Sequence, residues 1–168
     1  MSTDDARRAE FVSFCHEQAH RLVGFVIRLG ASPADADDVV QEVLLALFAS
    51  WDSVRDPRGW TRSVAIRTYL KSTPSAHHEI PTDAPPEQPT LISPEAHAEI
   101  VEAAKDITAL LSTLPFQQRM VLAWSIDGFS HEEIARALRT TPGAVRTALR
   151  RARGTLKKIM VKPQEVRS

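Results

Sequence analysis

Signals that begin and end helices fill residues 114–158 and constrain the fold more than any other feature of the chain. Pro115 suits the first position of a helix, because its missing N–H has no intrahelical partner there. Gly128 suits the position just beyond a helix end. These two residues predict a helix from Pro115 to Asp127.

Two further helices are predicted directly after the first. Ser130 and Glu133 form a capping box, in which each side chain accepts from a free backbone N–H of the other, and the helix it starts should end near Arg139. Thr141 caps the next helix, with Pro142 at its first position. Helices joined by so short a turn cross steeply, which is the helix-turn-helix arrangement. Its expected core consists of Leu122, Ile126, Phe129, Ile134, Leu138, Val145 and Leu149, with the small Ala135 at the crossing.

The last helix has separate apolar and basic faces. The apolar face contains Val145, Ala148, Leu149, Ala152 and Leu156, and the basic face contains Arg146, Arg150, Arg153 and Lys157. Residues 136–168 hold ten basic residues and one acid, a net charge of +9, whereas the whole chain has a net charge of zero. Because like charges repel and this helix is the one that a helix-turn-helix places in the major groove, the basic face predicts DNA binding.

The N-terminal half predicts three helices. The first runs from about Asp5 to Leu29, and the second starts at Ser32-Pro33. One face of the second helix is apolar, and the opposite side carries acidic residues and the exposed Leu45. On composition alone, this acidic side fits either simple solubility, with carboxylates near a helix N-terminus, or the docking of a basic partner.

The third predicted helix runs from Pro57 to about Lys71 and is basic. Residues 55–71 contain five basic side chains and one acid. Trp60 fits either a core position or a platform on which a base stacks. Residues 72–94 then contain six of the eleven prolines and no Lys or Arg, which predicts an extended linker. A further helix from Pro94 to Ser112 is expected to pack on the helix-turn-helix.

Several motifs resemble those of bacterial sigma factors of the small extracytoplasmic-function group, within the sigma-70 family. In the C-terminal half they are Leu114-Pro115, Gly128-Phe129-Ser130, Glu132-Glu133-Ile134-Ala135, Pro142-Gly143, Val145-Arg146 and Arg151-Ala152-Arg153; in the N-terminal half the segment is Asp35-Ala36-Asp37-Asp38-Val39-Val40-Gln41-Glu42. The resemblance implies an all-α fold of two small domains: an N-terminal domain of residues 1–71, a flexible linker of residues 72–93, and a winged-helix-like helix-turn-helix domain of residues 94–168.

The resemblance also implies where partners bind. Residues implied to dock on the clamp coiled coil of the largest RNA polymerase subunit are Asp35, Asp37, Asp38, Gln41, Glu42 and Leu45. Residues implied to hold the melted minus-10 strand are Arg58, Trp60, Arg62, Arg67 and Lys71. Residues implied to contact the minus-35 duplex are Thr141, Pro142, Arg146, Thr147, Arg150, Arg151 and Arg153. An inhibitory anti-sigma protein is a further implied partner, and the linker is either a passive tether or an acidic mimic of RNA.

The chain departs from the family pattern at three positions. Arg67 stands where Asn is frequent, Lys71 where Asp is frequent, and Arg139 where Gly often ends a helix. A long cationic Arg67 is expected to strengthen contact with a strand's backbone and to change which base is accepted.

Other classes find little support in the sequence. The chain shows no phosphate-binding glycine loop, no His-Glu-x-x-His and no paired cysteines, so we expect no enzyme and no cofactor. Cys15, His16 and His20 would make at most an incomplete metal site. Without an apolar run of membrane-spanning length or a signal peptide, we expect a cytoplasmic protein that does not bind membranes. A stand-alone helix-turn-helix regulator and a protein-only antagonist of polymerase or anti-sigma factors remain alternatives.

Overall fold

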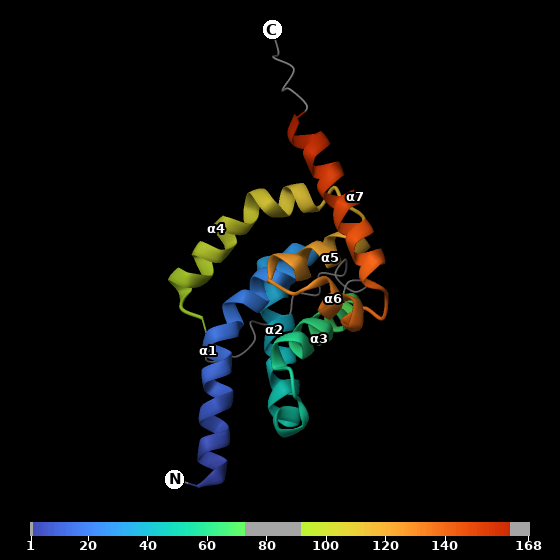
Figure 1. The fold of residues 1–168 in the computed structure, drawn as a ribbon. Coiled ribbons are helices and arrows are strands. Elements are labelled where there is room, and N and C mark those ends of the chain that lie inside the picture. Colours follow the sequence, from blue (N-terminus) through green and yellow to red (C-terminus); the bar gives the residue numbers. More distant parts are fainter. Residues whose placement is uncertain (1, 73–91, 162–168) are drawn as a thin grey trace.

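A computed structural model describes residues 2–72 and 92–161, and every regular element in these ranges is helical (Figure 1). The first unit contains α1 (Thr3–Leu29), α2 (Pro33–Ser50), the short 3-10 helix η1 (Trp51–Ser53) and α3 (Pro57–Ser72). The second unit contains α4 (Pro94–Leu111), α5 (Phe116–Ile126), α6 (His131–Ala137) and α7 (Pro142–Val161). The all-α prediction is confirmed, whereas most of the predicted linker of residues 72–93 lies outside the described residues.

Local capping interactions set the helix ends of the helix-turn-helix. The backbone N–H of Ser130 donates to Glu133 Oε2 at 2.7 Å, and the backbone N–H of Glu133 donates to Ser130 Oγ at 3.1 Å, as the capping box predicts. Thr141 Oγ1 accepts from the backbone N–H of Ala144 at 3.1 Å and caps α7. The α5 helix starts at Phe116, one residue later than predicted, because Pro115 has an extended ψ of 146° and lies at the N-cap.

The turn between α6 and α7 depends on an unusual backbone conformation at Arg139. Its φ of 53° lies in the left-handed region, where a side chain is strained and glycine is not. This geometry explains why glycine suits the position. The α6 helix ends at Ala137, two residues before the predicted end, because the chain must reverse there to start α7 at Pro142.

Most of the predicted helix-turn-helix core is buried, including Phe129, Ile134, Val145 and Leu149. Ile126 was expected in this core, but 48% of it is exposed. The buried side of α5 is formed by Val121, Leu122, Ala123 and Trp124 instead, and this leaves Ile126, the last residue of the helix, facing solvent.

The α4 helix packs differently from the prediction. Its apolar side was expected to cover the helix-turn-helix, but α4 lies along α1, and a narrow groove between them is lined by Gly24 and Arg28 from α1 and by Ile100 and Ala104 from α4. Among the residues of α4, only Leu111 is fully buried. The second unit therefore contacts the first through its entry helix as well as through α5.

One continuous hydrophobic core joins the two units. Phe25 of α1 and Trp124 of α5 meet edge to face with ring centroids 5.8 Å apart, and both are almost completely buried. Tyr69 of α3 stacks on Phe116 of α5 at 6.2 Å. Gly30, directly after α1, has a φ of 120°, and a Cβ atom there would lie 3.1 Å from the Tyr69 hydroxyl oxygen. The absence of a side chain at Gly30 therefore leaves room for Tyr69. The packing of α5 against α1 and α3 fixes how the two units face each other.

We expect Phe25→Ala to lower the free energy of unfolding by about 3–5 kcal/mol, because the substitution leaves a cavity beside Trp124. Val12→Ala is the control, since Val12 lies on the same helix and is 42% exposed. Urea titration followed by circular dichroism measures both variants. Equal losses in the two variants would contradict a shared core at Phe25.

Candidate functional site

The polar face of α2 is presented to solvent as predicted. Asp35, Asp38, Gln41 and Glu42 are all exposed. The opposite face is buried and contains Ala36, Val40, Val43, Leu44 and Leu47. Ser32 caps this helix by accepting from the backbone N–H of Asp35 at 3.1 Å. The helix thus holds its carboxylates on one side of a rigid element, with an apolar side anchored in the core.

An apolar patch adjoins these carboxylates. Leu45 is 67% exposed and Phe48, one turn further along α2, is 40% exposed. Arg7 of α1 lies over the Phe48 ring, with its guanidinium carbon 5.6 Å from the ring centroid, and its Nε atom is 2.8 Å from Asp52 Oδ2. Phe48 and Arg7 were not predicted from the sequence, although Phe48 follows Leu45 by three residues, a spacing that places Leu45 and Phe48 on one helical face.

Asp37 differs from the other acidic residues of α2. It is half-buried, and its Oδ2 atom lies 2.8 Å from His97 Nε2 of α4. Burial raises the pKa of Asp37, and the neighbouring His97 acts in the opposite direction. Asp37, one of the six residues implied to dock on polymerase, is therefore already in contact with a residue of the second unit.

The basic face of α7 is open to solvent. Arg146, Arg150, Arg151 and Arg153 are exposed, whereas the inward residues Val145, Leu149 and Ala152 are buried. Thr141 is exposed at the helix start, and Pro142 and Thr147 are half-buried. The structure thus brings together the arginines implied to contact the minus-35 duplex on the solvent side of α7, with Thr141 at its start.

The basic residues of α3 fall into two groups. Arg67 and Lys71, near the C-terminal end of the helix, are exposed. Arg58 and Trp60 are half-buried at its start, and Arg62 is completely buried. Trp60 lines a cavity of about 620 Å³ and also packs against the hydrophobic core.

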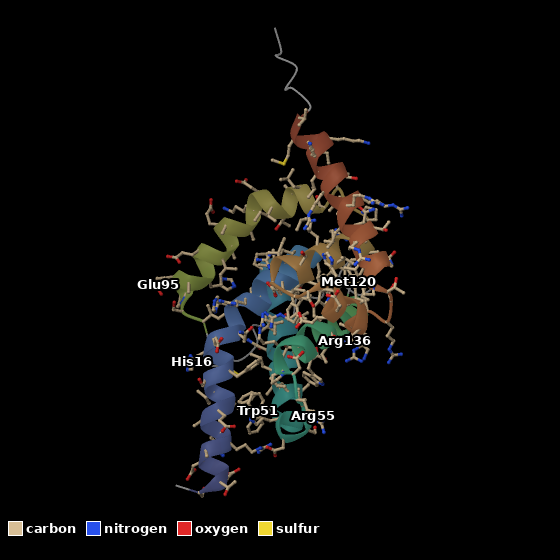
Figure 2. The ribbon with its side chains drawn as sticks, viewed as in Figure 1. His16, Trp51, Arg55, Glu95, Met120 and Arg136 are labelled. Atoms are coloured by element: carbon tan, nitrogen blue, oxygen red, sulfur yellow. The ribbon has the colours of Figure 1, made fainter. Side chains whose placement is uncertain are left out.

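This cavity lies between the two units. Arg55, from the segment before α3, and Arg136, from α6, line it together with Trp60 and Trp124. Arg55 and Arg136 are labelled in Figure 2. The start of α3, where Trp60 lies, is therefore partly covered by the helix-turn-helix in this arrangement.

Arg62 is buried because it pairs with the second unit. Its Nε atom lies 2.9 Å from Asp127 Oδ2, directly after α5, and its Nη1 atom donates to Gln18 Oε1 of α1 at 3.0 Å. Burial lowers the pKa of Arg62, and the charge and hydrogen bond of Asp127 act in the opposite direction. Arg28 Nη1 also lies 3.1 Å from Asp127 Oδ1, and Arg58 Nη2 donates to the Asp127 carbonyl oxygen at 3.2 Å. Nothing in the local sequence pattern around Asp127 predicted this cluster.

The described ranges contain neither a cluster of metal-ligating side chains nor a helix of membrane-spanning character. Residues 2–72 and 92–161 contain no group of three or more His, Cys, Asp and Glu side chains arranged to hold a metal ion. Cys15 is a buried thiol in the core. No helix within the same ranges is both long and apolar enough to span a bilayer.

Family comparisons match both halves of the chain. Residues 16–73 match sigma-70 region 2, and residues 104–156 match sigma-70, region 4. A stand-alone helix-turn-helix regulator is not favoured, because the N-terminal half matches a sigma factor region of its own.

Whole-chain comparisons agree with these two matches. The RNA polymerase sigma-E factor of Streptomyces avermitilis is 30% identical over 152 residues, covering 88% of this chain and 83% of the relative. SigD of Mycobacterium tuberculosis, a sigma factor of the extracytoplasmic-function group, is 35% identical over 144 residues. The match covers 80% of this chain and 66% of SigD.

Two solved structures share the fold. RpoE of Bartonella quintana, solved with the anti-sigma factor NepR, has a TM-score of 0.70 at 19% identity and covers 92% of this chain and 99% of its own. CnrH, solved with the cytosolic domain of CnrY, has a TM-score of 0.65 at 21% identity, and the match covers 91% of this chain and 88% of the CnrH chain. Together with the sequence relatives, these matches show that the chain belongs to the extracytoplasmic-function group of sigma-70 family sigma factors, which bind core RNA polymerase and direct promoter-specific initiation.

Proposed function

We propose that this sigma factor divides its work between two oppositely charged surfaces. The acidic face of α2 in the domain of residues 1–71 docks on the polymerase, and the basic face of α7 in the domain of residues 94–168 reads the minus-35 duplex. The observation that carries this proposal is that both faces are exposed on separate helices, each with its apolar side fixed in the core. A linker of residues 72–93 would let the two domains reach separate targets.

Docking on the polymerase combines charge with apolar contact. The carboxylates of Asp38 and Glu42 suit the basic surface of a helical coiled coil, and they steer association over distances of about a Debye length. Leu45 and Phe48 would then bury apolar surface at the centre of the contact, at about 25 cal/mol per Å² of area removed from water. Asp35 and Gln41 lie at the rim, and Asp37 takes part only when His97 releases it.

We expect the double variant Asp38→Ala and Glu42→Ala to weaken binding to core polymerase by about tenfold, equivalent to about 1.4 kcal/mol. The loss should shrink as salt concentration rises, because exposed charges are screened. Glu99→Ala with Asp106→Ala is the matched control, since both acids are exposed on α4. A fluorescence anisotropy titration with labelled protein measures affinity, and an unchanged affinity in the α2 variant would refute this docking face.

Reading of the minus-35 duplex is assigned to the start and middle of α7. An arginine that donates two hydrogen bonds to guanine discriminates against other bases, and Arg146 and Arg150 are the first two exposed arginines within α7. Thr141, Pro142 and Thr147 would shape the contact near the helix N-terminus. Arg151 and Arg153 are assigned to phosphates, which add affinity without sequence information.

We expect Arg146→Ala to cost about 1–3 kcal/mol of discrimination at one minus-35 position and to relax the preference there. Arg153→Ala serves as the contrast. It should weaken binding to all promoters alike and reduce the slope of log affinity against log salt concentration by about one. Initiation from a promoter library with randomised minus-35 positions measures both effects. If Arg146→Ala leaves promoter choice and strength unchanged, the assignment of base reading to this residue is wrong.

The exposed end of α3 supplies the contacts proposed for the melted minus-10 strand. Arg67 and Lys71 would lie along its phosphates, and Trp60 would meet a base at the start of the helix. Arg58 and Arg62 belong to the same proposed surface but contact Asp127 in this structure.

We expect Arg67→Ala to reduce the fraction of open promoter complexes with little change in minus-35 preference, because it removes a phosphate contact. Permanganate reactivity of unpaired thymines measures strand opening. Arg8→Ala is a control at an exposed arginine of α1. Open complexes as abundant as those of the unsubstituted protein would remove Arg67 from the strand-binding surface.

We further propose that the protein acts in the cytoplasm, supplies no catalytic group, and is held inactive by an anti-sigma protein. Support for the last point is that the structural relative RpoE was solved with an anti-sigma factor. Run-off transcription tests the overall function: specific transcripts should appear only when this protein is added to core polymerase. Equal amounts of specific transcript from core polymerase alone would contradict the proposed function.

A further inference from the structure

The contacts of Asp127 resemble those of a bound phosphate. Two arginines of the first unit pair with its carboxylate, Arg62 at 2.9 Å and Arg28 at 3.1 Å. Arg58 donates to its carbonyl oxygen and lies over the Phe129 ring, with the guanidinium carbon 4.9 Å from the centroid. An oxygen anion surrounded by guanidinium groups is the arrangement that arginines make around nucleic-acid phosphates.

Two of these arginines belong to the surface proposed to hold the melted strand. Arg58 and Arg62 follow each other one turn apart on α3, and both are engaged by the segment between α5 and α6. Because Arg62 is completely buried in this contact, a strand's phosphate can reach it only after Asp127 has moved away. The cavity beside Trp60, lined by Glu133 and Arg136 of α6, is closed on one side by the same unit.

The closed arrangement leaves polar atoms without partners. Among the described residues, Arg62 Nη2 and Trp124 Nε1 are buried donors that have no hydrogen-bond acceptor. Buried donors without acceptors destabilise the state that buries them, and water would satisfy both when the units separate. Opening thus recovers part of the free energy lost with the ion pairs.

We infer that Asp127 is an internal competitor for nucleic-acid phosphate: in the free protein it occupies Arg58 and Arg62, and the single strand must displace it to bind α3. This inference rests on the proposed strand-binding function of α3. Displacement also separates the helix-turn-helix from the first unit, because Asp127 lies in the segment that joins α5 to α6. Binding of the strand and opening of the two units are then one equilibrium.

Three variants separate the competition from a merely structural role. Asp127→Asn removes the charge and keeps the size of the side chain, so it leaves Arg62 and Arg28 without a counter-charge. Arg62→Met removes one arginine, but Arg28 still pairs with Asp127. Asp106→Asn on the exposed surface of α4 is the matched control.

The first readout is the distance between the units, measured by double electron–electron resonance between spin labels. Cysteines at the exposed positions Ala49 and Gly154 accept the labels. Native Cys15 stays unlabelled, because burial raises the pKa of its thiol to about 11. We expect one narrow distance in the unsubstituted protein and in Asp106→Asn, a broad and longer distribution in Asp127→Asn, and a smaller change in Arg62→Met.

The second readout is binding of a fluorescein-labelled short oligodeoxythymidylate to the full chain without polymerase. Asp127→Asn should bind about tenfold more tightly, because a larger fraction is competent to bind. Arg62→Met should not gain affinity, although it also loosens the units, because it removes a phosphate contact.

The outcomes distinguish the possible failures. A narrow distance in Asp127→Asn overturns the inference. So does equal oligonucleotide affinity of Asp127→Asn and the unsubstituted protein, which would show that α3 binds a strand without competition. If Asp127→Asn opens the units but neither protein binds the strand, the proposed function of α3 is wrong and the inference falls with it.

Discussion

The packing of α5 against α1 and α3 decides which charged side chains of this sigma factor remain available. Phe25 and Trp124 bury their rings together, and directly after α5 the carboxylate of Asp127 meets Arg28 and Arg62. Breaking a buried ion pair by removing one partner costs roughly 3–5 kcal/mol, so the position of Asp127 matters to the whole arrangement. Residues far from this contact, on α2 and α7, keep their charged faces in solvent.

Charge segregation then follows from ordinary helix amphipathicity. Each functional helix places aliphatic side chains in the core and its charges opposite, so the core fixes the direction of the charged face. In the proposed function, an acidic and a basic surface on separate helices would let one neutral chain bind a protein and a nucleic acid at once. The net charge of zero conceals this division, because the basic excess of residues 136–168 is balanced by acids elsewhere.

Interactions between residues close in sequence were predictable, and interactions between the two units were not. The capping box of Ser130 and Glu133 and the basic face of α7 depend on spacings of three or four residues, which a sequence displays directly. The pair of Arg62 and Asp127 spans 65 positions, and no periodicity reports it. The same limit explains why Ile126 was expected in the core and α4 on the helix-turn-helix, since both depend on which neighbour each helix meets.

The division between a polymerase-facing helix and a DNA-facing helix is the central claim, and site-specific photocrosslinking in one promoter complex tests it most directly. A photoreactive amino acid at position 45 should crosslink to the largest polymerase subunit, and the same group at position 150 should crosslink to the minus-35 duplex. Crosslinks from position 150 to protein alone, or from position 45 to DNA, would contradict the account.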